Sequence, residues 1–196
     1  MKIQPSRRNS GFTLVELLVV IAIIAVLAGA GFAAGNAAIQ KAKRVTALAT
    51  CTALESAVNN FFTEYGSMPK ADLTADDTIN TKTDLTFLRV LLGTEGTSTS
   101  ALNTRAIKFL SVREGKSGKN GLLYNTSGND ITGLVDPWGG PFFLRLDGDY
   151  DERLTASPVG TTAKVLNGRR AAAWSNGSDA GPAGSSGAAG DNVISW

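Results

Sequence analysis

An acidic residue interrupts the most apolar stretch of this 196-residue chain. Glu16 lies four residues after Phe12, inside a run of aliphatic side chains. A carboxylate inside a lipid bilayer costs roughly 2.5–3.5 kcal/mol on insertion scales, so it requires a partner or a function. If the chain were cut between Gly11 and Phe12, the new amino group would lie about one helical turn from Glu16. The two groups could then neutralise each other, within one molecule or between neighbours.

A second group of carboxylates lies in the body of the chain. Asp147, Asp149 and Asp151 alternate with other residues, and their spacing is similar to the start of an EF-hand calcium loop. The similarity ends there, because the sixth position is Glu152 instead of Gly and the twelfth is Pro158 instead of Glu. We interpret the segment as a solvated acidic hairpin tip, and keep the three aspartates as an alternative calcium site.

The remaining reactive residues do not form a catalytic set. The chain contains no His, and Cys51 is its one cysteine, so no intrachain disulfide can form. Cys51 is interpreted as a small buried apolar residue. The run Gly115 to Lys119 (GKSGK) is similar to a phosphate loop, but the required glycine is replaced by Leu110, so it is predicted to be a basic surface turn. We predict that the protein is not an enzyme and holds no organic cofactor.

The charge distribution argues against nucleic-acid binding. The net charge is +2, and Lys2, Arg7 and Arg8 supply three positive charges near the start. The rest of the chain is therefore close to neutral, which gives no electrostatic reason to expect a nucleic-acid partner.

Residues 12–35 are predicted to cross a membrane. Between Leu17 and Ala34 there are 18 residues without a charged or strongly polar side chain. Together with the residues from Phe12, they approach the roughly 20 that a helix needs to span the hydrocarbon. The basic residues before the segment should stay in the cytoplasm, so the body would face outward. An ordinary secretory signal peptide, cleaved near Ala28, is the alternative, but it does not account for Glu16.

Residues 36–66 are predicted to continue this helix as an amphipathic one. Gly66 and then Pro69 should end it after Tyr65. Its apolar stripe follows a spacing of three or four residues and is expected to pack on a sheet: Val45, Leu48, Cys51, Leu54, Val58, Phe61 and Tyr65.

The junction Gly11-Phe12-Thr13-Leu14-Val15-Glu16 resembles the leader junction of type IV pilins and type II secretion pseudopilins. The resemblance covers the leader, residues 1–11, and the whole first helix. It implies cleavage after Gly11 by a prepilin peptidase and N-methylation of Phe12. It also implies that Glu16 pairs with the N-terminus of a neighbouring subunit during assembly.

Residues 67–196 are predicted to form an α+β body with a small antiparallel sheet, because the connections are too short for crossover helices. Residues 70–84 and 93–104 are expected to be loops, and 85–92 a short helix. Strands are expected at 107–112, 142–146, 164–166, 170–175 and 193–196.

Two later segments, DPWGGPFF from Asp136 and AAAWSNGSDAG from Ala171, resemble the major, G-type pseudopilin. That resemblance implies a calcium site in the loop from Ser178 to Asp191, with Ser178, Asp179 and Asp191 as ligands. Backbone carbonyls would have to complete the shell.

The expected function is that of a structural subunit of a type II secretion pseudopilus, anchored once in the bacterial inner membrane with its body in the periplasm. Its expected partners are copies of itself, minor pseudopilins, the inner-membrane assembly platform and the peptidase. The alternative is a type IV pilus subunit for adhesion, motility or DNA uptake, although the chain lacks the disulfide loop common in true pilins.

Overall fold

A computed structural model describes residues 11–96, 98–181, 183–184 and 187–196, with the backbone alone at 30, 31 and 33. The chain divides into two compact units, Met1–Ala42 and Lys43–Trp196. Leader residues 1–10 lie outside the described part, so the leader boundary stays a prediction. After Gly11, Phe12 and Thr13, the described residues of the first unit are all helical, and the second unit contains the sheet and the hydrophobic core.

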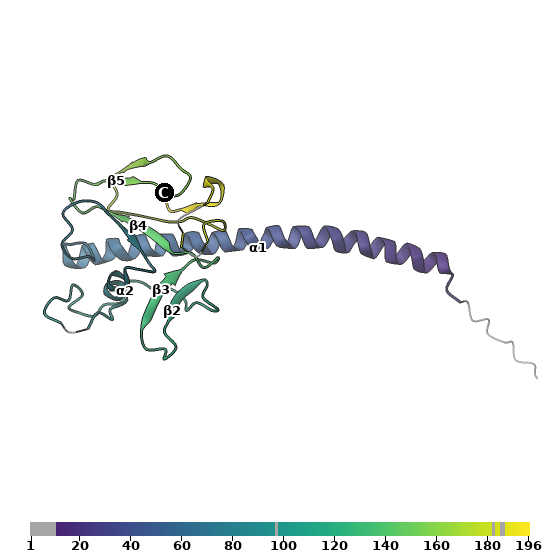
Figure 1. The fold of residues 1–196 in the computed structure, drawn as a ribbon, viewed down its shortest axis with the longest axis horizontal. Helices are drawn as coiled ribbons and strands as arrows, with labels where there is room; N and C mark the ends of the chain where they lie inside the picture. The colour runs from purple at the N-terminus through teal and green to yellow at the C-terminus, as the bar shows by residue number, and fades with distance from the viewer. Residues whose placement is uncertain (1–10, 97, 182, 185–186) are drawn as a thin grey trace, which may run out of the picture. The chain divides into compact units, whose positions relative to one another are not determined.

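The long helix α1 spans Leu14–Tyr65, within two residues of its predicted start (Figure 1). It begins where Thr13 caps it, and it ends at Gly66. The φ angle of Gly66 is 69°, a left-handed conformation that glycine adopts without strain. The prediction of one continuous helix followed by a glycine stop is confirmed.

The amphipathic stripe of α1 was placed correctly only in its second half. Cys51, Leu54, Val58 and Phe61 are fully buried. Val45 and Leu48 are 60% and 42% exposed, so their predicted burial is wrong. Each three-residue step turns a helix by only about 300°, so repeated steps of three move the stripe around the surface. Ala47, one helical turn before Cys51, takes the buried place instead.

A four-stranded antiparallel sheet packs on α1, in the order β1-β4-β7-β8. Its strands are β1 (Asp77–Asn80), β4 (Phe142–Leu146), β7 (Ala171–Ser175) and β8 (Val193–Ile194), with a short 3-10 turn at Ala189–Asp191. Ile79 and Leu144 are paired neighbours and share one buried cluster with Leu54 and Phe61 of α1. Alternation along β4 buries Phe142, Leu144 and Leu146 on this face. The predicted α+β class is confirmed.

Two hairpins complete the body. One joins β2 (Gly121–Tyr124) to β3 (Ile131–Val135), and the other joins β5 (Arg153–Ala156) to β6 (Lys164–Asn167). The second hairpin forms a small core with the other face of the sheet, made of Leu154, Ala156, Leu166, Ala172 and Trp174. Because both faces are covered, all five residues of β7 are buried.

The helix α2 (Leu85–Leu92) is confirmed, and the strands expected at 142–146, 164–166, 170–175 and 193–196 are found as β4, β6, β7 and β8. One predicted strand is wrong. Residues 107–112 form no strand, because the N–H groups of Phe109 and Leu110 both donate to the carbonyl of Leu91 at the end of α2. β1 lies inside the predicted 70–84 loop, and β2, β3 and β5 were not predicted. β1 has one buried residue, Ile79, among polar neighbours, so its sequence carries little strand signal.

Candidate functional site

The start of α1 places the Glu16 carboxylate against Thr13. Glu16 Oε2 accepts hydrogen bonds from the Thr13 N–H (2.9 Å) and from the Thr13 hydroxyl (2.8 Å). The Thr13 hydroxyl in turn accepts one from the Glu16 N–H (3.2 Å). This reciprocal arrangement is a capping box, which satisfies N–H groups that have no partner within the helix. Glu16 Oε1 has no partner among the described residues, so one carboxylate oxygen stays available.

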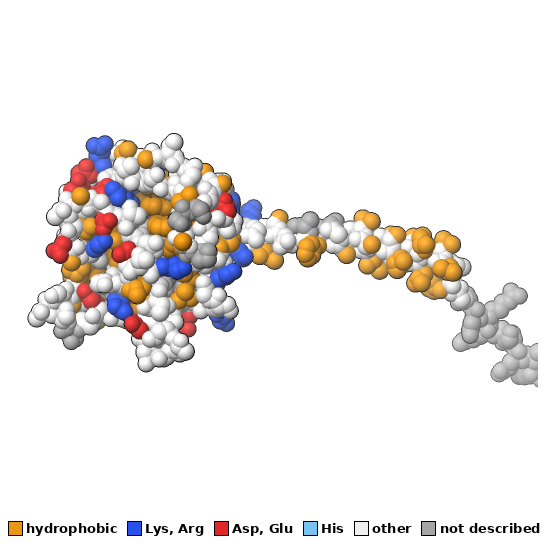
Figure 2. Space-filling model, in the orientation of Figure 1, with side chains coloured by type: hydrophobic (Ala, Val, Ile, Leu, Met, Phe, Trp, Pro, Cys, Tyr) orange, Lys and Arg blue, Asp and Glu red, His pale blue; other side chains and the backbone are white. Residues whose placement is uncertain are grey.

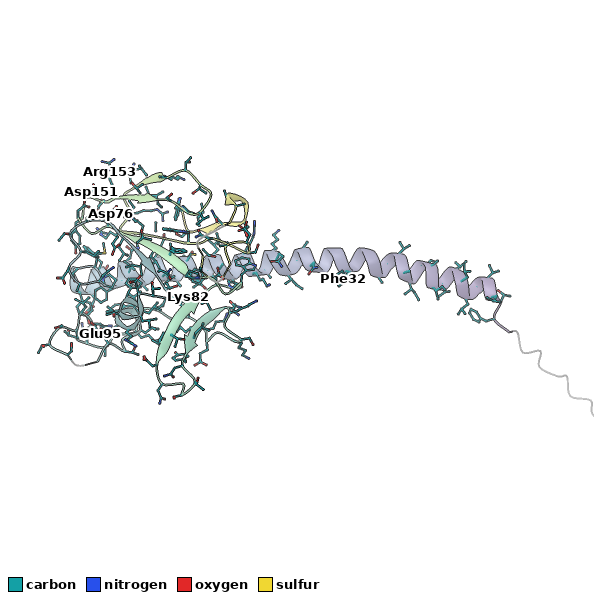
Figure 3. The ribbon with its side chains drawn as sticks, in the orientation of Figure 1. Phe32, Asp76, Lys82, Glu95, Asp151 and Arg153 are labelled. Atoms are coloured by element: carbon teal, nitrogen blue, oxygen red, sulfur yellow. The ribbon has the colours of Figure 1, made fainter. Side chains whose placement is uncertain are left out.

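The first unit exposes its apolar side chains. Every described side chain of α1 within this unit lies on the surface. Figure 2 shows this part of α1 covered by hydrophobic side chains, and Phe32, marked in Figure 3, is 77% exposed. Among the described helices, α1 alone has the length and composition to cross a membrane. No described residue of its own unit covers this surface, which suits contact with a bilayer or with other helices.

In the second unit, a buried carboxylate organises the DPWGG turn. Asp136 Oδ1 accepts the N–H groups of Trp138, Gly139 and Gly140 at 2.8–2.9 Å. Asp136 Oδ2 accepts the Ser175 hydroxyl at 2.6 Å, which ties the turn to β7. Burial raises the pKa of Asp136, and these four donors oppose that rise. The sequence analysis used this segment only for a family resemblance, and its Asp136 network was not predicted.

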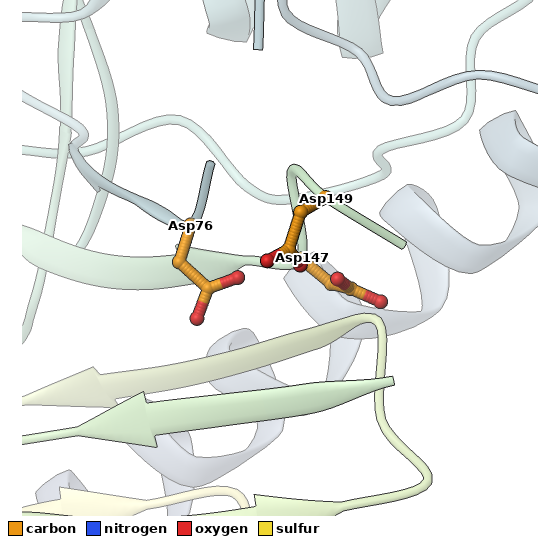
Figure 4. Close-up of side chains that lie close together, drawn as sticks. All are labelled: Asp76, Asp147 and Asp149. Atoms are coloured by element: carbon orange, nitrogen blue, oxygen red, sulfur yellow. The ribbon is translucent and has the colours of Figure 1, made fainter. Parts of the chain in front are cut away.

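The alternative calcium residues lie at the β4–β5 connection. The structure brings Asp76, and not Asp151, to Asp147 and Asp149, with ligand oxygens within 4.8 Å of one another (Figure 4). The Asp151 N–H donates to Asp147 Oδ1 (3.2 Å), while its side chain accepts the Arg153 N–H (2.8 Å). Asp76 and Asp151 are labelled in Figure 3.

This acidic group already has an internal cation. Arg145 Nε lies 3.6 Å from Asp76 Oδ2. Burial raises the pKa values of both Asp76 and Asp147, and Arg145 partly offsets the rise at Asp76. Asp147 is only 1% exposed, so the prediction of a solvated tip is wrong for this residue.

The other predicted calcium residues meet in the loop before β8. Asp191 Oδ2 accepts hydrogen bonds from the Ser178 N–H, the Ser178 hydroxyl (2.7 Å) and the Asp179 N–H (3.1 Å). Asp179 Oδ2 accepts the Ala188 N–H (2.6 Å). Burial opposes ionisation of Asp191, but the Ser178 and Asp179 donors prevail and lower its pKa. Ser178, Asp179 and Asp191 therefore lie together, as predicted.

Two oxygens beside this loop lack donors. Asp191 Oδ1 and Asn192 Oδ1 are buried without a hydrogen-bond partner among the described residues. Asn192 Nδ2 donates to the Val159 carbonyl (2.8 Å), which fixes the orientation of the amide. A Cβ atom on Gly177 would lie 2.5 Å from the Asp191 carboxylate, so glycine is required there. Buried acceptors without donors are the groups that a cation would satisfy.

Comparison with known proteins bears on the N-terminal segment. Residues 6–32 match a family model described as the prokaryotic N-terminal methylation motif. The chain carries a type IV pilin-like prepilin signal. Residues 6–10 of the match lie outside the described part, and the remainder contains the Thr13–Glu16 cap and the exposed apolar helix. No curated protein and no solved structure matches the chain.

The motif and the helix together fit anchoring in the inner membrane by a single pass, and prepilin-peptidase processing followed by filament assembly. They support a type IV pilin-like subunit, a class that is generally structural and not enzymatic.

Proposed function

We propose that the protein is a structural subunit of a type II secretion pseudopilus, which polymerises from the inner membrane and drives protein export. The observation that carries the proposal is Glu16, held at the head of an exposed apolar helix within a methylation motif. Prepilin peptidase would cleave between Gly11 and Phe12, and the new amino group of Phe12 would be methylated. The partners would be further copies, minor pseudopilins and the assembly platform, with the body in the periplasm.

The capping geometry supports a role for Glu16 in registering subunits. Oε2 is used by Thr13 in the same chain, which leaves Oε1 for the amino terminus of a neighbouring subunit. Pairing an ammonium group with a carboxylate in a bilayer removes the cost of burying either charge alone. A subunit that brings its amino group to a neighbour's Glu16 is therefore favoured over one placed a turn away.

The apolar surface of α1 would supply the lateral contacts. Its aliphatic side chains lie on all sides of the helix between Phe12 and Ile39. A helix that is apolar all round suits first a bilayer and then the core of a helical filament. The bodies would form the outer shell.

Substitution of Glu16 tests this mechanism. Glu16→Ala should abolish filaments seen by electron microscopy and reduce export to background, because the neighbour's amino group loses its partner. Val15→Ala is the matched control, since it trims the adjacent side chain and keeps the carboxylate. Wild-type filament yield and export from Glu16→Ala would refute the registration role.

Deletion of the gene distinguishes the two filament types. Loss of protein export with surface filaments unchanged is expected for a pseudopilin. Loss of surface adhesion, twitching or DNA uptake with export intact would show a type IV pilus subunit instead. Cys51 is buried in the core and cannot form an intrachain disulfide, which favours the pseudopilin.

We also propose that the loop from Ser178 to Asp191 binds calcium. Asp191 Oδ1 and Asn192 Oδ1 are buried acceptors without donors, and Asp179 and Ser178 supply further oxygens nearby. Calcium would add a cation to this set of hard oxygen ligands and tie the loop to β8. The cluster of Asp76, Asp147 and Asp149 is the alternative site, but Arg145 already provides a positive charge there.

Calorimetric titration of the chelator-treated protein tests both sites. At a calcium concentration 100 times the Kd, binding should stabilise the fold by about 2.7 kcal/mol. Asp191→Asn should remove the heat of binding and the shift in melting temperature, while Asp149→Asn should leave both unchanged. The reverse pattern would move the site to the β4–β5 connection, and no binding by the wild type would exclude calcium.

A further inference from the structure

Four cationic side chains surround one groove of the body. Lys43, Arg113, Lys116 and Lys119 line a hollow of about 440 Å³, together with Glu114, Asn120 and Pro137. Figure 2 shows Lys and Arg side chains gathered on the edge of the body where its part of α1 begins. The groove lies wholly within the second unit, and its lining includes both lysines of the GKSGK segment, which the proposed function leaves without a role.

These cations are not neutralised by carboxylates in the described part of the chain. The ion pairs found there use other basic residues: Lys70, Arg89, Arg105, Arg145, Arg169 and Arg170. Arg113 donates to the neutral side chain of Asn120. Glu114 is the one acidic residue in the lining. Like charges around one hollow repel each other, so an anion in the groove would be attracted by several of them at once.

The groove is built on a rigid support. Lys116 and Lys119 exchange two backbone hydrogen bonds, 2.9 and 3.1 Å, so their side chains leave the hairpin on the same side. The next residue, Asn120, donates its N–H to the Asp136 carbonyl at 2.8 Å. The cationic hairpin is therefore fixed to the turn that Asp136 organises.

The position of the groove in the chain identifies its ligand. Lys43 follows the predicted membrane segment, which ends at residue 35, by eight residues. Even fully extended, eight residues span less than about 30 Å, so the groove cannot move far from the lipid surface. Basic side chains beside a membrane helix attract the phosphates of anionic lipids. The groove suits one headgroup. None of the described residues that line it is aromatic, so it offers no platform for base stacking, which argues against a nucleic acid.

We propose that Lys43, Arg113, Lys116 and Lys119 bind the phosphate of an anionic phospholipid at the outer surface of the inner membrane. The proposal rests on the membrane anchor in the proposed function, and not on the type of filament. Binding holds the body of the waiting subunit against the bilayer. The contact is released when the subunit leaves the membrane and enters a filament.

Lipid binding by the unassembled full-length protein tests the proposal. The protein is delipidated in detergent, and native mass spectrometry measures the Kd for added phosphatidylglycerol and for phosphatidylcholine. The wild type should prefer phosphatidylglycerol. Lys116→Gln/Lys119→Gln should reduce that preference about tenfold or more, since each basic residue near an anionic lipid contributes about 1 kcal/mol, or roughly fivefold.

A second hairpin supplies the matched control. Arg153→Gln/Lys164→Gln removes the same charge from the β5–β6 hairpin, where both side chains are exposed, and should keep the preference. Glu16→Ala should keep it too, so failure of assembly is distinguishable from failure of lipid binding. Unfolding midpoints verify that each variant folds.

Several results would overturn the proposal. An unchanged preference in the Lys116/Lys119 variant would do so, as would an equal loss in the control. Full displacement of the lipid by an equal concentration of inorganic phosphate would indicate a site for free phosphate. Tight binding of a DNA oligonucleotide without lipid preference would indicate a nucleic-acid partner. If Lys116→Gln/Lys119→Gln lost filaments but kept the wild-type lipid preference, the groove would instead be a contact between subunits.

Discussion

Replacement of Asp136 should destabilise the body more than is usual for a residue in a turn between two strands. The Asp136 carboxylate accepts four hydrogen bonds, three from the N–H groups that follow it and one from Ser175. Asp136 is almost fully buried, and the N–H groups of Gly139 and Gly140 and the Ser175 hydroxyl are buried with it. Asp136→Ala would leave the Gly140 N–H and the Ser175 hydroxyl without this acceptor, whereas the Gly139 N–H would keep the Asp136 main-chain carbonyl at 3.1 Å.

The magnitude follows from the cost of a buried donor without a partner, about 1–3 kcal/mol each. Two such donors give about 2–6 kcal/mol. We expect a value near the lower end, about 2–4 kcal/mol, because removing the carboxylate also removes the cost of burying its charge. Ser175→Ala should cost about 1–3 kcal/mol, because the buried Gly177 N–H loses the Ser175 hydroxyl as its acceptor, while Asp136 keeps three N–H partners.

Urea unfolding of the two variants, followed by tryptophan fluorescence, measures both values. Asp136→Asn provides a further comparison, because it keeps an oxygen for the three N–H groups, and the Ser175 hydroxyl can turn to accept from the new amide. Asp136→Asn should therefore destabilise the body less than Asp136→Ala does. A loss below about 1 kcal/mol in Asp136→Ala would refute the reasoning, since ordinary surface changes lie in that range.

Three further predictions concern single residues. Gly93→Ala should lower the free energy of unfolding in urea more than Gly66→Ala does, although both glycines have φ of 69°. The left-handed conformation alone costs about 1–2 kcal/mol, and only the Cβ at Gly93 would lie 2.6 Å from a backbone oxygen, that of Ala106. Equal losses of stability in the two variants would contradict this clash. Cys51 should not react with a thiol reagent at about pH 8 until urea unfolds the protein, since burial raises the pKa of its thiol; prompt labelling of the folded chain would show that the core opens there. Because the pKa of Asp191 is lowered in the folded protein, its carboxylate should stabilise the fold fully at pH values above the ordinary Asp pKa of about 3.9. This stabilisation should be lost as the pH falls through the lowered pKa of the folded state. Asp191→Asn should remove this part of the acid-induced fall in melting temperature, and an unchanged pH profile of the melting temperature would count against the prediction.

Local patterns predicted the helices well because their signals lie close together in the chain. The end of α1 depends on Gly66, and α2 depends on a short apolar run that Gly93 stops. The strands were harder to predict. β1 is polar at three of four positions and becomes a strand only because β4 offers it a partner. Conversely, residues 107–112 have strand-like side chains but find their hydrogen-bond partner at the end of α2.

The candidate sites likewise divide into one that local sequence revealed and others that only the fold brings together. Glu16 was identifiable from the sequence because a carboxylate inside an apolar membrane segment is costly and therefore indicates a function. Asp76 was not, because it lies far in sequence from Asp147 and only the pairing of β1 with β4 brings them together. The cationic groove likewise joins Lys43 of α1 to a hairpin more than seventy residues later.

What the sequence alone determined is the prepilin-like segment: an apolar helix, its acidic residue and the junction before it. These are properties of consecutive residues, and hydrophobicity and one-turn spacing are sufficient to define them. Only the tertiary structure decided which polar groups act together in the body. Glu55 of α1 accepts the Ala173 N–H of β7 at 3.1 Å, and Asp136 accepts a hydroxyl from Ser175. Such partners are selected by packing between distant segments, and no local pattern records that packing.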